Sequence, residues 1–430
     1  MSARPEVAVI GAGLAGLAAA RTLIEHGVDV EIFEASDRIG GRAHTIEVEH
    51  HDLPVELGPE FVHGAPDVTM NLVREASAEL EHLGNQNHVW QDGHLVHEHS
   101  MWRRLGKLLD HARRLPRDES ALDYLAHEHM SQKDADLFAM LVQGFYAAPL
   151  DDISIESITA DESGAGEEEA PSSTRIRGGY ARLVGWLGSR LAQLRVPIHH
   201  GFVLRHLDWG GDRVRLDGID RYAESRRAVV TLPIGVLHSG DVRFEPRIVE
   251  HEHALGQLAM GQVVKLVLCL HAPVWHRYAP HTVEFVHHHE LTFPTFWLRS
   301  RGDAHQVTAW AGGPYALAVA NWLKADLVEQ ALVDLAEALR MPASELLESL
   351  VHVHFHDYMH DPFARGAYSY TRVGGTHAAN ALARPIADRL YFAGEATDAD
   401  YEGTVAGALA SGIRAAHQVL AHRGATGASR

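Results

Sequence analysis

The sequence predicts an α/β fold that is divided into at least two domains. A strand, turn, helix and strand unit opens the chain, and apolar strands such as 229–232 and 263–270 recur further along. Residues 67–150 are rich in Ala, Leu, Glu, His and Arg, with few β-branched runs, which favours helices. With 430 residues, 46% of them hydrophobic, the chain is long enough to build two or three packed cores.

The opening unit has the features of a Rossmann-type dinucleotide turn. A predicted strand, 7–10, leads into Gly11, Gly13 and Gly16, and a helix and a second strand, 28–34, follow. The first glycine permits the tight turn, the second lets backbone N–H groups approach a pyrophosphate, and the third lets helix and strand pack closely. We therefore predict a dinucleotide cofactor at this turn.

Two features after the turn indicate how the ribose and phosphates of that cofactor are bound. Glu34 ends the second strand about 20 residues beyond the glycines, where a ribose hydroxyl needs an acceptor, and its charge disfavours the 2′-phosphate of NADP. A second glycine-rich turn, 38–42, carries Arg38 and Arg42, whose guanidiniums can pair with phosphates. An ordinary surface loop with two arginines is the alternative interpretation of that turn.

The C-terminal part of the chain favours FAD over NAD. A strand ends in Gly394 and Glu395, and a helix rich in small residues begins near Gly403. Such a helix start brings backbone N–H groups and the positive end of the helix dipole close to a ring system, where they stabilise negative charge on a reduced flavin. Glycine and alanine leave room for that approach.

Together these segments resemble the flavin monoamine and polyamine oxidase family, which includes the lysine-specific histone demethylases. Four further segments resemble the family in the same order along the chain: 56–64, 231–237, 260–265 and 361–370. The resemblance therefore covers nearly the whole chain. It implies a Rossmann-type FAD-binding domain interleaved with a mixed sheet-and-helix substrate domain.

The resemblance also implies where the domains and the cofactor contacts lie. The FAD-binding domain would comprise 1–78, 176–254 and 362–430, and the substrate domain would comprise 79–175 and 255–361. The residues expected to contact FAD come from both glycine turns, the segment beneath the flavin, the Pro-containing strand turn and the C-terminal helix start. They are Gly11, Gly13, Leu14, Ala15, Gly16, Glu34, Ala35, Gly41, Arg42, Gly58, Pro59, Glu60, Val203, Pro233, Gly394, Glu395, Gly403, Thr404 and Val405.

The activity that the resemblance implies is oxidation of an amine by hydride transfer to flavin N5. The imine product is hydrolysed to an aldehyde and an amine, and dioxygen reoxidises the flavin to give hydrogen peroxide. We expect an aliphatic amine or a polyamine as the substrate. An L-amino acid oxidase or a flavin-dependent desaturase is the alternative enzyme, and a flavin-binding scaffold without turnover is the alternative outside enzymes.

Lys265 and Tyr368 are the catalytic residues that the resemblance implies. By itself Lys265 would be an exposed lysine on an edge strand, but in the family this lysine reaches through a water toward flavin N5. Tyr368 would be a cage wall that orients the amine, or else a buried aromatic with its hydroxyl satisfied. Glu60 and His63 are expected to face the substrate, with a local hydrogen-bonding role as the alternative for each.

Three departures from the family pattern bear on the chemistry. Ala367 stands where monoamine oxidases carry the cysteine that bonds to the flavin, so FAD is expected to be held non-covalently. Tyr358 stands where many relatives have a tryptophan near the flavin, and Thr404 stands where monoamine oxidases place the second cage tyrosine. Tyr358 and Thr404 are expected near the substrate, and Tyr368 is left as the one clear cage residue.

Composition argues against several other classes. The formal charge of −19 disfavours a nucleic-acid partner. The single cysteine, Cys269, can form no intramolecular disulfide, and no signal peptide or membrane anchor is expected, so a cytoplasmic location is predicted. The charged segment 161–169 is expected to be a solvated loop.

Histidine clusters at 287–289 and 352–356 raise the possibility of a metal. Neither comes with carboxylates or thiolates at ligand spacing, so surface histidines are expected instead. In the second cluster, His352, His354 and His356 alternate with apolar residues that would face inward.

Overall fold

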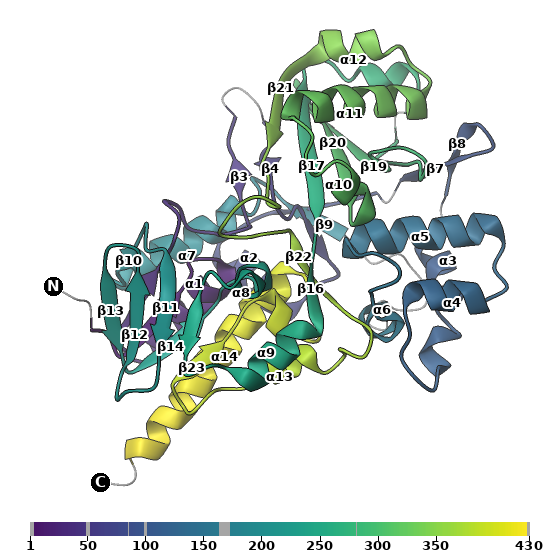
Figure 1. The fold of residues 1–430 in the computed structure, drawn as a ribbon. Helices are drawn as coiled ribbons and strands as arrows, with labels where there is room; N and C mark the ends of the chain where they lie inside the picture. Colours follow the sequence, from purple (N-terminus) through teal and green to yellow (C-terminus); the bar gives the residue numbers. More distant parts are fainter. Residues whose placement is uncertain are drawn as a thin grey trace.

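The computed structural model describes residues 4–48, 52–84, 86–98, 101–162, 173–280 and 282–427. It confirms the α/β class, with a parallel sheet and long C-terminal helix in one half and a larger mixed sheet with covering helices in the other (Figure 1).

A five-stranded parallel sheet, in the order β10-β2-β1-β14-β23, forms the core of the first half. Its strands are β1 (Val7–Ile10), β2 (Val30–Phe33), β10 (Ile198–His199), β14 (Arg227–Val230) and β23 (Leu390–Phe392). All its pairings are parallel, so the carboxyl ends of the strands meet at one edge, where ligands bind in sheets of this kind.

The two faces of this sheet have different covers. Val7 and Val9 point toward one face, which packs against helices, whereas Ala8 and Ile10 point toward the other, which packs against a second sheet. The helices are α1 (Leu14–Glu25), α2 (Asp67–Glu75), α7 (Ala181–Gln193) and α14 (Val405–Gly427). The second sheet contains β11 (Leu204–Asp208), β12 (Val214–Gly218), β13 (Tyr222–Ser225) and β15 (Arg243–Glu245), and beside it lie α8 (Ile234–Ser239), α9 (Val249–Gly256) and α13 (Ala378–Leu382).

A seven-stranded sheet, in the order β21-β17-β20-β19-β18-β7-β8, dominates the second half. Its strands are β7 (Asn87–Gln91), β8 (His94–His97), β17 (Val263–Leu270), β18 (Phe285–His287), β19 (Thr295–Arg301), β20 (Ala304–Gly312) and β21 (Leu350–Phe355). Three helices cover one face: α10 (Pro314–Ala318), α11 (Lys324–Leu339) and α12 (Ala343–Ser349). The other face looks toward the first half.

The rest of the chain connects these two halves. Three small sheets are formed by β3 (Thr45–Ile46) with β4 (Val55–Glu56), by β5 (Phe61–His63), β6 (Leu80–His82) and β9 (Ser173–Ile176), and by β16 (Leu258–Gly261) with β22 (Tyr368–Thr371). A helical group contains α3 (Met101–Leu108), α4 (Ala121–His127), α5 (Gln132–Tyr146) and α6 (Ile155–Glu162). Three short 3₁₀ turns cover Ala112–Arg114, Val274–Arg277 and Glu395–Thr397. In the part of the chain that the structure describes, no helix is long and apolar enough to cross a membrane.

The parallel sheet takes its strands from separated stretches of the sequence, because β1 and β2, β10 and β14, and β23 lie far apart along the chain. This is the arrangement expected of interleaved domains. We propose that 1–78, 176–254 and 362–430 form the cofactor domain, with 79–175 and 255–361 as the substrate domain.

Some local predictions are wrong. The stretch 67–150 contains β6, β7 and β8 as well as helices, because its apolar residues near 80–97 pair in two sheets. The prediction of surface histidines fails at His287 and His288, which are 6% and 2% exposed. Val351 is 52% exposed instead of facing inward. Segment 161–169 begins in helix, since α6 ends at Glu162, and its remainder, 163–169, lies outside the described residues.

Candidate active site

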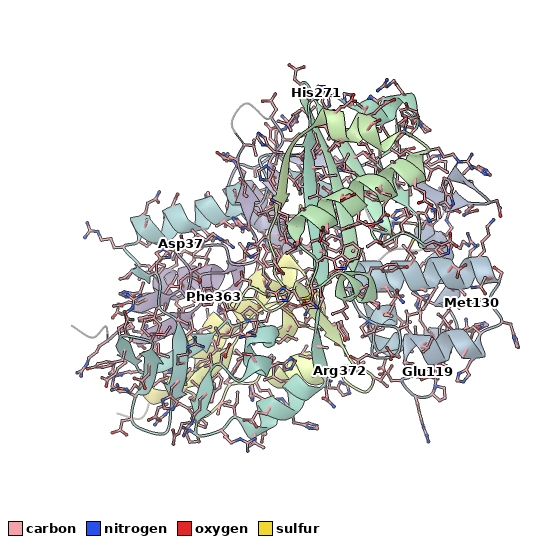
Figure 2. All side chains as sticks on the ribbon, turned by 45° about the horizontal axis from the view of Figure 1, so that its top comes forward. Asp37, Glu119, Met130, His271, Phe363 and Arg372 are labelled. Carbon is pink, nitrogen blue, oxygen red and sulfur yellow. The ribbon has the colours of Figure 1, made fainter. Side chains whose placement is uncertain are left out.

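A cavity of about 860 Å³ runs from the carboxyl edge of the parallel sheet to the seven-stranded sheet. This volume is within the range of cofactor and small-molecule sites. Every residue that the sequence assigned to cofactor, substrate or catalysis lines it, except Gly16. Phe363 also lines it, although this residue is 39% exposed. Figure 2 shows Glu119 and Met130 at the outer end of the helical group, away from Phe363.

The first glycine turn fits a pyrophosphate. Gly11 has φ +103°, and a Cβ there would lie 2.5 Å from Thr231 Oγ1. A Cβ on Gly16 would lie 2.0 Å from the Gly11 carbonyl oxygen, so Gly16 serves the packing of α1 on the turn and does not line the cavity. A Cβ on Gly13 would meet nothing within 4 Å, which leaves open space beside the backbone where a phosphate could approach.

Glu34 lies at the end of β2 and is 7% exposed. Its Oε2 accepts a 2.6 Å hydrogen bond from the Ala12 amide, and its Oε1 accepts 2.8 Å hydrogen bonds from the amide and hydroxyl of Ser36. The carboxylate is therefore fixed in orientation at the cavity wall. It lies beside the glycine turn, to which the Ala12 amide joins it, as a ribose-binding acid requires.

Arg42 joins the second glycine turn to the C-terminal part of the site. Its Nη1 donates 2.8 Å to Glu395 Oε1 and 2.9 Å to the carbonyl of Ala367. The other oxygen of Glu395 accepts hydrogen bonds from the Ser369 hydroxyl at 2.5 Å and from the Gly403 amide at 3.1 Å. Glu395, which is 5% exposed, thus ties three segments together at the predicted flavin end.

The start of α14 is set by Thr404. Its hydroxyl accepts a 3.1 Å hydrogen bond from the Gly407 amide and donates 2.8 Å to the Tyr401 carbonyl. This is the arrangement of a helix N-cap, and it explains why the helix begins at Val405, close to the predicted position. Thr404 still lines the cavity, so capping and contact with a ligand are compatible.

Two tyrosines hold backbone segments in place around the cavity. Tyr368 donates a 2.7 Å hydrogen bond to the Phe145 carbonyl at the end of α5, and burial raises its pKa. Tyr358 is 7% exposed and donates 2.9 Å to the Arg42 carbonyl. The hydroxyl of Tyr368 is therefore satisfied by the protein, which leaves the ring for contact with a ligand.

Lys265 lies on an internal strand, so the edge-strand explanation does not apply to it. The residue is 5% exposed, and it shares one face of β17 with Val267 and Cys269, whereas Val264 and Leu266 face the helical layer. Its Nζ lies 3.1 Å from both the Gly58 carbonyl and Glu60 Oε2.

Glu60 is enclosed by donors. Its Oε2 accepts a 2.9 Å hydrogen bond from Trp297 Nε1 in addition to Lys265, and its Oε1 accepts 2.8 Å from Arg175 Nε. Burial alone would raise the pKa of Glu60, but Lys265 and Arg175 outweigh burial and hold it well below its usual range. The carboxylate is thus anionic near neutral pH.

His63 presents its ring to the cavity. Nδ1 lies 3.1 Å from Ser173 Oγ, and the ring contacts those of Phe61 and Phe145 with centroids 5.9 and 5.4 Å away. The His63 side chain is exposed toward the cavity, and loss of solvent around the ring lowers its pKa to about 4, so the ring is neutral at physiological pH.

Sequence reasoning missed several residues of the site. Arg175 gave no local signal, because it meets Glu60 only through the pairing of β9 with β5. The aromatic wall of the substrate part was also missed, because alternation along a strand does not tell which face borders a cavity. These lining residues are Phe61, Trp102, Phe145, Tyr146, Phe285, Trp297, Trp310 and Tyr370.

The residues present fit a flavin dinucleotide. Ala367 lines the cavity and has no nucleophile, and Cys269 is 2% exposed and does not line the cavity. Among the described residues, no group of three or more His, Cys, Asp or Glu side chains could hold a metal ion.

Comparison with known proteins agrees with this geometry. Residues 14–420 match the family described as flavin containing amine oxidoreductase. The chain is 25% identical to polyamine oxidase 2 of Arabidopsis thaliana, with 96% of this chain and 87% of that protein covered. It is also 25% identical to lysine-specific histone demethylase 2 of Homo sapiens, of which it spans 53%.

Solved structures share the fold at low identity. A putrescine oxidase bound to putrescine superposes with a TM-score of 0.81 and 19% identity, covering 97% of this chain and 99% of that one. Cyclohexylamine oxidase from Brevibacterium oxydans IH-35A gives a TM-score of 0.81 and 18% identity with the same coverage.

Proposed function

Because the chain belongs to the family of flavin-containing amine oxidoreductases, we propose that it oxidises an aliphatic amine or a polyamine with non-covalently bound FAD. The observation that carries this proposal is the single cavity that joins the glycine turn at Gly13 to a chamber walled by Tyr368 and Trp297. One end suits a dinucleotide and the other suits a hydrocarbon chain that bears an amine.

The cofactor would be held by residues from three separated segments. Gly11 and Gly13 would leave room for the pyrophosphate, Glu34 would accept from a ribose hydroxyl, and Arg42 with the start of α14 would border the flavin. When bound, the flavin supplies the hydride acceptor for the C–H bond next to the amine nitrogen, and we propose dioxygen as the final acceptor, giving hydrogen peroxide.

The substrate chamber would orient the amine by its apolar part. Contact with rings such as Phe285 and Trp310 would remove the methylene groups of the substrate from water and so stabilise the bound amine. The faces of these rings also attract a cationic group. The ring of Tyr368 would act as a cage wall. His63, whose pKa is lowered to about 4, would stay neutral and could accept a hydrogen bond from the amine.

An L-amino acid oxidase is less well supported. Such an enzyme needs a cationic partner for the substrate carboxylate, usually an arginine. Among the described residues, the arginines that line the cavity are Arg38, Arg42 and Arg205. Arg38 and Arg42 belong to the second glycine turn and Arg205 follows Val203 and Leu204 beside the parallel sheet, so all three lie at the dinucleotide end.

A direct assay tests the proposal. Purified protein supplied with FAD is incubated in air with butylamine, putrescine, spermidine and acetylated spermidine, and hydrogen peroxide and aldehyde are measured. We expect both products from at least one of these amines, in equal amounts. If flavin is reduced by an amine but no peroxide appears in air, the acceptor is not dioxygen; if no amine gives product, the proposed substrate class is wrong.

The mode of FAD binding needs a separate measurement. Acid precipitation should release all of the flavin into the supernatant, because Ala367 cannot bond to it and Cys269 is buried and does not line the cavity. Yellow colour that stays with the washed pellet would contradict non-covalent binding.

A further inference from the structure

We propose that Glu60 is a positioning residue, the fixed counter-ion that holds the Lys265 ammonium at the cavity wall, and that Arg175 keeps Glu60 in place. Glu60 therefore does not recognise a second ammonium group of a diamine. The inference rests on the proposed function for the meaning of the site, and its tests are chosen so that the two can fail separately.

Both carboxylate oxygens of Glu60 already have partners from the protein. Lys265 Nζ and Trp297 Nε1 share Oε2, at 3.1 and 2.9 Å, and Arg175 Nε binds Oε1 at 2.8 Å. The side chains are almost fully buried: Lys265 is 5% exposed, Arg175 8% and Glu60 9%. Three of the roughly four acceptor positions of the carboxylate are thus taken by buried donors. A substrate ammonium that displaced one of these donors would leave it buried without its partner, which is costly.

The charges around Glu60 also argue against attraction of a second cation. Lys265 and Arg175 together outweigh the single negative charge of Glu60. Arg299, which is 8% exposed, adds another cation, and its 2.6 Å partner Glu81 lies on the solvent side at 34% exposure. A distal ammonium that approached Glu60 would therefore meet an environment that is not net negative.

Lys265 has capacity left for the cavity. An ammonium group has three N–H donors. In the part of the chain that the structure describes, Lys265 uses two of them, on the Gly58 carbonyl and Glu60. The third is left for a water or a ligand in the cavity, which Lys265 lines. Because two N–H groups of Lys265 are fixed by hydrogen bonds, the direction of the third is fixed as well. In this way Glu60 positions Lys265.

The titratable groups that face this pair come from three elements. They are Glu56 at the end of β4, Arg175 on β9 and Arg299 on β19. Burial raises the pKa of Glu56 to about 7, although Thr45 and the Tyr180 amide donate to it. Glu56 is thus the group nearby that titrates near neutrality, and any pH profile must be compared with a Glu56→Gln variant.

The first test asks whether Glu60 distinguishes a diamine from a monoamine. Glu60→Gln keeps the shape of the side chain and removes its charge. We expect kcat/KM for putrescine and for butylamine to fall by the same factor, within about threefold, because both amines depend on Lys265 and neither binds Glu60. A loss for putrescine at least about tenfold greater than that for butylamine would overturn the proposal, because it would identify Glu60 as the site of the second ammonium.

The second test requires no amine. The flavin of the FAD-loaded protein is reduced photochemically, and its reoxidation by dioxygen is followed by stopped flow from pH 6 to 10. Without its counter-ion, Lys265 is no longer held at the cavity wall, so Glu60→Gln should reoxidise at least about tenfold more slowly than the parent protein across this range. Arg175→Gln should slow the step in the same direction, and Arg175→Lys should restore the rate in part.

Superimposable profiles for the parent and Glu60→Gln would overturn the proposal. This result would stand even if no amine were found that reduces the flavin, so failure of the inference and failure of the proposed function are distinguishable.

A third test measures the pairing itself. In thermal unfolding of the full-length, FAD-loaded protein, Glu60→Gln and Lys265→Met should each lower Tm by at least about 2 °C, and the double variant should lose clearly less than the sum. Strictly additive losses would mean that the two side chains do not act as a pair.

Discussion

The backbone amide of Ala12 donates a 2.6 Å hydrogen bond to Glu34 Oε2, which joins the glycine turn to the acid at the end of β2. The two residues are 22 positions apart, and the parallel pairing of β1 with β2 brings them together. Glu34 therefore shapes the turn as well as offering an acceptor to a ribose.

Replacement of Glu34 by alanine should weaken FAD binding by about 1.5 to 3 kcal/mol, the range for hydrogen bonds to a charged group. The reaction of enzyme kept saturated with FAD should change far less, because the ribose is remote from the reacting atoms. Glu31→Ala is the matched control, since Glu31 lies on the same strand but pairs with His199. Equal FAD affinities of the parent and Glu34→Ala in a fluorescence titration would show that Glu34 is not the ribose ligand.

Two glycines of the first turn should respond differently to alanine. Gly11→Ala meets Thr231 Oγ1 at 2.5 Å and forces a side chain to φ +103°, so it should destabilise the protein by roughly 1 to 3 kcal/mol even without FAD. Gly13→Ala meets nothing within 4 Å, so the FAD-free protein should keep its Tm while FAD affinity falls. Unchanged FAD affinity in Gly13→Ala would show that the pyrophosphate does not bind beside Gly13.

The sequence was sufficient to predict the parts of the candidate site that depend on local backbone geometry. The glycines of the first turn, the position of Glu34 and the small residues before α14 all act through backbone conformation within a few residues, so their pattern is visible in the chain. The alternation of residues along β17 likewise agrees with the structure, where Lys265 shares a face with Val267 and Cys269.

The sequence was not sufficient to predict contacts between side chains that lie far apart along the chain and meet through strand pairing. Glu60 and Arg175 are 115 residues apart and meet because β5 pairs with β9, and Trp297 reaches Glu60 from a strand of another sheet. The buried position of His287 depends on Asn87 of β7, which is parallel to β18. No local pattern encodes these contacts.

Acid should destabilise the protein partly through His287. Burial lowers its pKa from 6.5 to about 4, so the unfolded chain binds a proton there before the folded chain does, and stability should fall as the pH drops from about 6.5 to 4. The contribution is on the order of 3 kcal/mol. The Tm values of the parent and His287→Asn should therefore converge as the pH falls. The Tm of His94→Asn, a variant at an exposed position, should stay a constant distance from that of the parent. Parallel curves for His287→Asn would contradict this origin.

Lys265→Met keeps length and apolar packing but deletes the ammonium, so the fold and bound FAD should survive at some cost in stability, because Glu60 keeps Arg175 as its remaining cation. We predict that reoxidation of the flavin by dioxygen slows by roughly 10- to 1000-fold. Stopped flow separates this step from reduction by the amine. If both half-reactions run at parental rates, Lys265 is a structural residue of β17 only.

Anaerobic titration with amines tests the central claim most directly, because loss of the yellow colour reports transfer of electrons from the amine to the flavin. We predict that slim aliphatic amines such as butylamine, putrescine or spermidine bleach the bound flavin, and do so faster than benzylamine. Faster bleaching by benzylamine would contradict the aliphatic substrate class. If no amine in the panel bleaches the flavin while dithionite does, the chain does not act on these amines, and our account of the cavity as an amine oxidation site is wrong.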